Sequence, residues 1–237
     1  MFKRIMRRAF KAFDLTLVKD YDGDLDEEFR ALYAQLRPYT MTSPIRFHAL
    51  YRAVRHVIRH KIPGDFVECG VWRGGGPMLA AKMLLKPSDT ARRLFLYDTF
   101  RGMSEPGDLD VSRRGEDARE YWKKAQKGQI TDWCYSSIEE VRKNMLSTGY
   151  PEEKIVFVEG KVEETIPGTI PQEISVLHLD TDWYQSTYHE LVHLYPRLAA
   201  NGIMIIDDYG LWRGARRAVD RYLQEQEAPI YLHRIDS

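Results

Sequence analysis

Short apolar runs recur along the chain, and most are followed by a segment with apolar residues at helical spacing. The runs are typical of buried strands, and the segments between them of amphipathic helices. Repeated strand–helix units predict a doubly wound, mostly parallel α/β sheet with helices on both faces. The predicted strands span 65–71, 94–98, 155–158, 175–180, 203–207 and an edge strand at 229–234, and the predicted helices span 27–36, 44–60, 77–85, 185–199 and 214–226.

The segment 101–134 interrupts this alternation. It is charged, contains glycine and carries Trp122 and Trp133. An insertion of this length is either a lid that faces a substrate or an ordinary surface excursion. We divide the chain into an N-terminal helical extension at 1–42 and a main domain at 43–237.

The first thirteen residues predict a basic amphipathic helix. Phe2, Ile5 and Phe10 recur at helical spacing, whereas Lys3 and Arg7 lie on the other face. We expect this helix to dock on the core or on a partner subunit, as in a homo-oligomer. Peripheral contact with an anionic membrane through residues 1–13 is the alternative.

Composition and charge narrow the class of protein. The 237 residues are 43% hydrophobic, which supports a full core, and 35 basic and 35 acidic side chains give no net charge. This balance argues against a nucleic-acid-binding protein. Cys69 and Cys134 form neither a disulfide framework nor a metal motif. No signal peptide or membrane-spanning run is recognised, so we expect a reducing, cytoplasmic location.

Two pairs of aspartates each close an apolar run. Asp180 and Asp182 follow the run 176–179, and Asp207 and Asp208 follow the run at 203–206. In an open α/β sheet, ligands bind at the carboxyl ends of the strands. Carboxylates that converge there repel one another unless a cation lies between them, and Mg²⁺ takes oxygen ligands. The pattern therefore indicates a metal-assisted enzyme.

The first strand leads into a loop with the pattern E-x-G-x-x-x-G, formed by Glu68, Gly70 and Gly74. Glycines allow the backbone to come close to a ligand at a helix N-terminus. A dinucleotide site would show G-x-G-x-x-G instead, whereas an acidic residue two positions before the glycine is typical of S-adenosylmethionine sites. Asp98 closes the second strand, where a carboxylate either accepts hydrogen bonds from ribose hydroxyls or caps a turn.

Four short blocks follow one another at the ends of predicted strands. They read G-D-F-V-E-C-G-V-W-R-G-G at 64–75, Y-D-T-F-R-G-M at 97–103, L-D-T-D-W-Y-Q-S-T at 179–187 and I-D-D-Y-G-L-W-R-G-A at 206–215. With these blocks, the chain from Met41 to Leu223 resembles the macrocin O-methyltransferase (TylF-like) family. The resemblance implies a class I methyltransferase fold, S-adenosylmethionine and Mg²⁺ as cofactors, and methylation of a sugar hydroxyl on a small-molecule or glycan-precursor acceptor.

The same resemblance implies roles for individual residues. Leu211 and Trp183 depart from the family pattern beside the acceptor, so the identity of the acceptor is not carried over. The implied metal ligands are Asp180, Asp207 and Asp208, and the implied cofactor-binding residues are Thr42, Ser43, Glu68, Gly70 and Asp98, with Ser137, Glu159 and Gly160 near the adenine.

The expected reaction is direct displacement of a methyl group by a sugar oxygen. A sugar hydroxyl is a poor nucleophile at neutral pH, and Mg²⁺ would orient and acidify it. Asp180 and Asp182 are the candidate catalytic bases that take the proton. Asp182 is also expected to cap the helix that begins near Gln185, and His178 to occupy a packed core position.

Three other functions stay open. A catechol-type O-methyltransferase would use the same carboxylates on an aromatic diol, and acceptor polarity separates it from a sugar enzyme. A nicotinamide-dependent oxidoreductase is disfavoured by the spacing of Gly70 and Gly74 and by the surplus aspartates. A non-catalytic membrane or glycan-assembly adaptor would not need intact acidic clusters.

Overall fold

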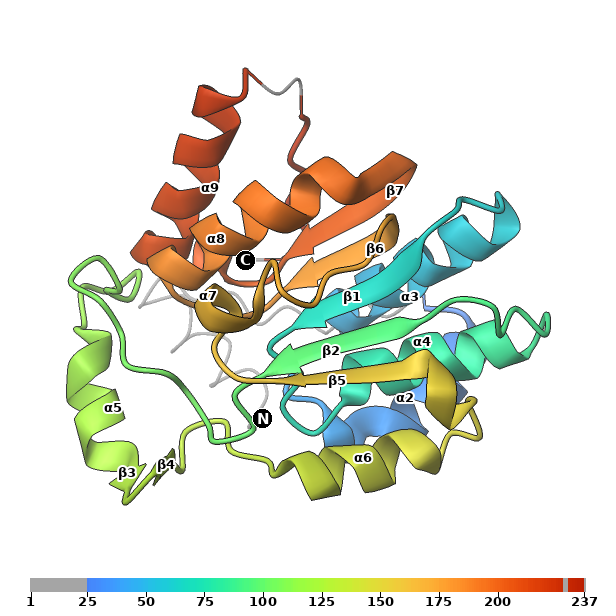
Figure 1. The fold of residues 1–237 in the computed structure, drawn as a ribbon, viewed down its shortest axis with the longest axis horizontal. Coiled ribbons are helices and arrows are strands. Elements are labelled where there is room, and N and C mark those ends of the chain that lie inside the picture. Colours follow the sequence, from blue (N-terminus) through green and yellow to red (C-terminus); the bar gives the residue numbers. More distant parts are fainter. Residues whose placement is uncertain (1–24, 228–229, 237) are drawn as a thin grey trace, which may run out of the picture.

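The computed structural model describes residues 25–227 and 230–236, and the predicted helix at 1–13 lies outside them. Its main sheet has five strands, all parallel, in the order β5-β2-β1-β6-β7 (Figure 1). This arrangement confirms the predicted parallel α/β sheet. The strands are β1 (Asp65–Cys69), β2 (Leu94–Asp98), β5 (Ile155–Glu159), β6 (Ile174–Leu179) and β7 (Leu198–Ile206).

The order in which the strands are added to the sheet reverses between β1 and β6. The chain runs outward from β1 through β2 to β5, and then returns to form β6 and β7 on the other side of β1. The loops that follow β1 and β6 meet at this point, where the Asp180 amide donates to the Cys69 carbonyl oxygen at 2.9 Å. Such a switch point is where open α/β sheets bind their ligands.

Helices cover both faces of the sheet, and each face has its own apolar core. Phe47 and Leu79 belong to one core, and Leu177 and Val219 to the other. The two layers appear on opposite sides of the strands in Figure 1. The first layer contains α2 (Glu27–Leu36), α3 (Pro44–Arg59), α4 (Gly75–Leu85) and α6 (Ile138–Leu146), and the second contains α7 (Val162–Thr165), α8 (Tyr184–Leu194) and α9 (Arg213–Glu225).

Helix α2 shares the core of the main domain, although it precedes the predicted boundary at residue 42. Phe29 and Leu36 are buried in the same apolar cluster as Phe47 of α3. Its start is fixed by Asp26, whose side chain accepts from the Phe29 amide at 2.8 Å. The division of the chain at residue 42 stays a prediction.

Two predicted elements near the C-terminus were wrong. The helix predicted at 185–199 ends at Leu194, because Pro196 has no amide hydrogen and Leu198 already begins β7. The predicted edge strand at 229–234 is absent from the described residues 230–234, which have no strand partner. Of the helices that the structure describes, none has the length and apolar character needed to cross a membrane.

Helix α6 was missed by the sequence analysis. Its signal is the pair Ser137 and Glu140, three positions apart, which is typical of a capping box. The Ser137 side chain accepts from the Glu140 amide at 3.3 Å. Polar side chains such as Glu140 and Asn144 interrupt the apolar stripe of this helix, and for this reason its periodicity is weak.

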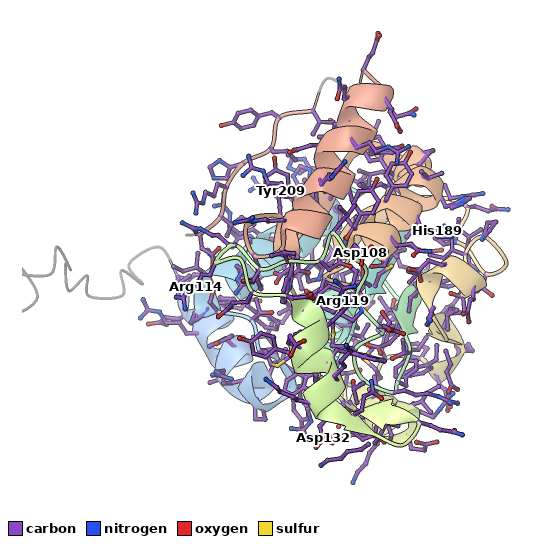
Figure 2. The ribbon with its side chains drawn as sticks, turned by 90° about the vertical axis from the view of Figure 1, so that its left-hand side faces the viewer. Asp108, Arg114, Arg119, Asp132, His189 and Tyr209 are labelled. Atoms are coloured by element: carbon purple, nitrogen blue, oxygen red, sulfur yellow. The ribbon has the colours of Figure 1, made fainter. Side chains whose placement is uncertain are left out.

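The insertion folds against the carboxyl ends of the strands. It contains α5 (Ala118–Ala125) and a short hairpin of β3 (Gln126–Lys127) and β4 (Ile130–Thr131). Figure 2 views the molecule from the insertion's side and shows Asp108 and Arg119 close together there, where they form a 2.5 Å ion pair.

Asp110 anchors the insertion to the start of α8. This carboxylate is 1% exposed and accepts hydrogen bonds from the amides of Gly107 at 2.7 Å and Tyr184 at 2.8 Å. A second connection runs from the Arg213 amide to the Val111 carbonyl oxygen at 2.9 Å. The insertion is therefore hydrogen-bonded to the two helices that follow the acidic loops.

Candidate active site

An open pocket lies at the switch point between β1 and β6, and part of its space is continuous with solvent. The loops after the strands supply the floor, and both ends of the insertion supply a wall. The lining residues include Gly70, Trp72, Asp98, Gly102, Met103, Cys134, Gly160, Lys161, Asp180 and Asp182.

Gly70 shapes the floor of the pocket. Its φ is +84°, and a Cβ atom at this position would lie 2.0 Å from the carbonyl oxygen of Asp180. Any other residue would push the loops of β1 and β6 apart. Trp72, Cys134 and Asp182 also have positive φ values, of 46°, 54° and 68°. Backbone strain of this kind gathers at functional sites.

Asp98 braces the glycine loop from the end of β2. One of its carboxylate oxygens accepts from the amides of Val71 at 2.8 Å and Trp72 at 3.1 Å. The other accepts from the Phe100 amide at 2.8 Å. Burial raises the pKa of Asp98, and these amides oppose that rise. The carboxylate therefore has the turn-capping role that the sequence left open, and it also lines the pocket.

Four aspartates gather at the carboxyl ends of β6 and β7, as the sequence predicted. Asp180 and Asp182 line the pocket, and Asp208 is buried behind them, where it accepts from the Asp182 amide at 3.2 Å. Burial raises the pKa of Asp180 well above its ordinary value, and the charges of Asp207 and Asp208 add to this effect. Full ionisation of the cluster is therefore unfavourable without a cation beside it.

Asp182 is held by a tryptophan at the start of α9. The indole nitrogen of Trp212 donates to Oδ1 of Asp182 at 2.7 Å. Burial, followed by the charge of Asp180, raises the pKa of Asp182 to about 8. The expected helix-capping role was wrong, because Trp183 is the N-cap of α8 and makes no side-chain cap hydrogen bond.

Three tryptophans pack together beside this carboxylate. The ring centroids of Trp183 and Trp212 are 5.1 Å apart, and Trp133 of the insertion lies 5.6 Å from Trp183. The Trp183 indole donates to the Ser104 carbonyl oxygen at 3.0 Å. The insertion and the acidic loops therefore form one wall of aromatic rings.

Arg46 is a site residue that the sequence analysis missed. It lies on α3, and its guanidinium donates to Asp207 Oδ2 at 2.6 Å. Its Nε atom lies 3.1 Å from Asp236 near the C-terminus. No motif around Arg46 indicates this role, since Asp207 is 161 positions away. The guanidinium brings positive charge to the edge of the aspartate cluster.

Glu68 and His178 form a buried pair under the glycine loop. His178 Nδ1 lies 3.0 Å from Glu68 Oε2, and the two side chains are 6% and 4% exposed. Burial lowers the pKa of His178, but the charge of Glu68 outweighs it and raises the value to about 9. A Cβ on Gly76 would lie 2.1 Å from the same carboxylate. Glu68 thus supports the loop from below, outside the residues that line the pocket.

The other predicted cofactor residues divide into two groups. Gly160 lines the pocket. Ser43 and Ser137 cap α3 and α6, and Glu159 pairs with Arg101 at 3.5 Å. Thr42 donates its amide to Thr40 Oγ1 at 3.1 Å. Thr42, Ser43, Ser137 and Glu159 lie outside the residues that line the pocket.

The donors of the site fit the chemistry of the two implied cofactors. Oxygen atoms from several carboxylates, with pKa values raised by burial and mutual repulsion, suit a divalent cation. A glycine loop, a strand-end carboxylate and the side chain of Trp72 around one pocket suit an adenosine-containing ligand. Together with the doubly wound sheet, these features define a class I methyltransferase.

Comparison with known proteins gives the family. Residues 3–237 match the family described as Macrocin-O-methyltransferase (TylF). The chain belongs to this family and is an O-methyltransferase. It is 33% identical over 204 residues to the 8-demethyl-8-(2,3-dimethoxy-alpha-L-rhamnosyl)-tetracenomycin-C 4'-O-methyltransferase of Streptomyces olivaceus, covering 85% of this chain and 75% of that protein.

Two further relatives support the assignment. The demethyldecarbamoylnovobiocin O-methyltransferase of Streptomyces niveus is 32% identical over 198 residues, covering 84% of this chain and 72% of that protein. The mycinamicin III 3''-O-methyltransferase of Micromonospora griseorubida is 31% identical over 184 residues, covering 78% of this chain and 70% of that protein.

Solved structures agree on the fold. The O-methyltransferase NovP superposes with a TM-score of 0.72 at 30% identity, covering 84% of this chain and 78% of that chain. The calicheamicin methyltransferase CalS11 superposes with a TM-score of 0.54 at 21% identity, covering 91% of this chain and 90% of that chain. This second likeness concerns the fold alone.

Proposed function

We propose that this protein transfers a methyl group from S-adenosylmethionine to a sugar hydroxyl of a small molecule or glycan precursor, with the help of Mg²⁺. The observation that carries the proposal is the meeting of Asp180, Asp182 and Asp207 beside the switch-point pocket. The relatives named above include enzymes that act on a rhamnosyl group. Their acceptors support a sugar as the substrate class.

The proposed cofactor site is the floor of the pocket. Gly70, Asp98 and Gly160 line it, and Lys161 adds a positive charge beside Gly160. Glu68 would act from below, by holding the loop that carries Gly70. The predicted contacts of Thr42, Ser43, Ser137 and Glu159 stay predictions.

The proposed metal ligands are Asp180, Asp207 and Asp208. When bound, S-adenosylmethionine supplies an already activated methyl group, and Mg²⁺ supplies positive charge that acidifies a nearby hydroxyl. Asp180 and Asp207 would hold the cation at the pocket's edge. Asp208 braces Asp182 through its backbone amide.

Asp182 is the proposed base that takes the hydroxyl proton. It lines the pocket, where a carboxylate can accept the proton of an acidified hydroxyl. The hydrogen bond from Trp212 fixes the carboxylate's direction. Asp180 is the second candidate, but a role as metal ligand would engage its oxygens.

The insertion is proposed to cover the acceptor. Gly102, Met103 and Cys134 already line the pocket, and Trp133 packs against Trp183. These contacts would exclude water from the reacting hydroxyl. A homo-oligomer, membrane contact through residues 1–13 and a cytoplasmic location stay predictions.

The test is calorimetric titration of S-adenosylhomocysteine into the full chain, with Mg²⁺ and then with EDTA. Binding in both conditions is expected, since none of the proposed cofactor residues is a proposed metal ligand. Acceptor screening would follow, with glycosides and aromatic diols in parallel. No binding in either condition would reject the cofactor site, and turnover of diols alone would favour a catechol-type enzyme.

A further inference from the structure

His178 is a buried histidine of which one ring nitrogen is engaged and the other is not. It is 5% exposed, and Nδ1 lies 3.0 Å from Glu68. Among the residues that the structure describes, Nε2 has no hydrogen-bond partner. A buried polar atom without a partner is costly. Its presence in a strand next to the aspartate cluster points to a ligand.

The register of the sheet places the side chain of His178 on the same face as the aspartates. Glu68 of β1 lies opposite His178 of β6, which in turn lies opposite Ile205 of β7. Side chains alternate along a strand, so Asp180 and Asp207, each two positions further on, face the same side as His178. This is also the side from which Arg46 reaches Asp207.

The distances suit a single ion. One ring nitrogen of His178 and one carboxylate oxygen each of Asp180 and Asp207 all lie within 4.8 Å of one another. Because Glu68 already occupies Nδ1, the nitrogen that remains for a metal is Nε2, which would release its proton to solvent when an ion binds. The group that the fold assembles thus has a nitrogen donor, which the three-aspartate set lacks.

We propose that His178 Nε2 joins Asp180 and Asp207 as a ligand of the metal centre, so that the centre binds a transition ion such as Co²⁺ more tightly than Mg²⁺. Glu68 is the positioning residue that fixes the imidazole through Nδ1. This inference rests on the metal site of the proposed function and names the ion that the site prefers.

The chemistry of the donors supports both the histidine ligand and the preference for a transition ion. A metal-bound histidine usually donates its other ring N–H to a carboxylate, which fixes the ring and the tautomer. Glu68 and His178 already have this relationship before any ion binds. Imidazole nitrogen suits first-row transition ions, whereas Mg²⁺ selects oxygen. The nitrogen ligand would therefore increase the affinity for a transition ion more than the affinity for Mg²⁺.

The experiment is metal binding to the full chain, measured by calorimetry with Co²⁺ and with Mg²⁺. Wild type is expected to bind Co²⁺ at least about ten-fold more tightly than Mg²⁺. His178→Gln should weaken Co²⁺ binding by about 10–100-fold and change Mg²⁺ binding much less. The matched control is His60→Gln, since His60 is exposed at the end of α3, and it should behave as wild type.

Proton NMR of the Co²⁺ complex identifies the ligand directly. The ring N–H of a ligating histidine gives a strongly shifted signal that exchanges with solvent. Wild type should show this signal, His178→Gln should lose it, and Glu68→Gln should keep it while binding Co²⁺ about ten-fold more weakly. If His178→Gln fails to fold, a wild-type spectrum without the signal still overturns the histidine ligand.

The outcomes separate this inference from the function on which it rests. Co²⁺ binding without the exchangeable signal would overturn the histidine ligand and leave a carboxylate-bound metal. Equal loss of Co²⁺ and Mg²⁺ binding in His178→Gln would also overturn it. Binding of neither ion would remove the metal site altogether, whereas S-adenosylhomocysteine binding tests the methyltransferase site independently.

Discussion

The indole of Trp212 and the carboxylate of Asp182 are joined by a 2.7 Å hydrogen bond, although they lie in the loops that follow different strands. Asp182 has a positive φ of 68°, which is uncommon for a residue other than glycine. The tryptophan fixes the direction of its carboxyl group. Because Trp212 also packs on Trp183, the bond links the proposed base to the aromatic wall.

Replacing Trp212 by phenylalanine should therefore lower the turnover rate strongly and the free energy of unfolding only slightly. The ring remains in the cluster, but the Asp182 carboxyl group loses a hydrogen-bond donor, worth about 1 kcal/mol. We expect kcat to fall by about ten-fold or more, with S-adenosylhomocysteine affinity unchanged. Trp122→Phe is the control, because it removes an indole bond to the Met103 carbonyl oxygen and leaves Asp182 untouched. Equal losses in both variants would contradict a role for this bond.

Asp207→Asn should abolish the response to metal and leave cofactor binding nearly unchanged. Asp207 belongs to the donor group with His178 and Asp180, whereas it lies outside the residues that line the pocket. An amide oxygen carries no charge and is a weaker ligand. Turnover at increasing Mg²⁺ and titration of S-adenosylhomocysteine measure the two properties separately. Full activity in the variant would remove the metal from the mechanism.

Arg46→Ala should destabilise the metal-free protein and increase its thermal shift on adding metal. Without the guanidinium, Asp207 keeps its charge beside Asp180, so unfolding becomes easier by about 1–3 kcal/mol. A divalent cation would replace the lost positive charge. Thermal melts in EDTA measure the stability of the metal-free protein, and melts in Mg²⁺ measure the shift that the metal causes.

The control for this prediction is Arg55→Ala on the same helix. Arg55 pairs with Asp26 at 2.9 Å, and its side chain is 50% exposed. Exposed pairs contribute little, so this variant should melt close to wild type. If Arg46→Ala gained no more stability from metal than Arg55→Ala does, the guanidinium would not compensate the cluster.

The positions of the aspartates could be predicted from the sequence, but their partners could not. Asp180 and Asp207 end apolar runs, and the carboxyl ends of parallel strands share one edge. The contact between Glu68 and His178 spans 110 positions and depends on β1 pairing with β6. Periodicity within a segment reveals which face a side chain is on, but it does not reveal the neighbouring strand.

The same limit applies to Glu68, whose role at the cofactor stays a prediction. Its place two residues before Gly70 fits that role, and the sequence contains no sign that its side chain turns towards His178 and Gly76. The capping signal at Ser137 was present and could have revealed α6. Glu68 therefore has a structural partner that the local pattern does not display, whereas the partner of Ser137 lies within the local pattern.

Asp110→Ala should release the insertion from α8. Two amides, of Gly107 and Tyr184, would lose their acceptor in a buried position, at a cost of about 3 kcal/mol. We expect faster tryptic cleavage at Arg113 and Arg114. Asp108→Ala is the control, since Asp108 has an 87% exposed side chain and pairs with Arg119 on the surface. Unchanged cleavage in Asp110→Ala would show that other contacts hold the insertion.

Glu190 on α8 should make the protein less stable as the pH rises. It is 0% exposed, one oxygen accepts from Thr181 at 2.9 Å, and the other has no hydrogen-bond partner among the described residues. Burial raises its pKa well above the ordinary value of 4.5. The folded state therefore holds this proton to higher pH than the unfolded state does, and stability is lost as the pH rises above about 4.5.

Glu190→Gln keeps the hydrogen bond from Thr181 and removes the titration. The variant and wild type should be equally stable below about pH 4.5, and above it the variant should gain about 1.4 kcal/mol per pH unit until the folded pKa is reached. Urea unfolding at about pH 5, 6.5 and 8 measures the difference. Glu120→Gln, at an exposed position of α5, should follow wild type. Parallel stability curves for Glu190→Gln and wild type would mean that Glu190 is solvated when the chain is folded.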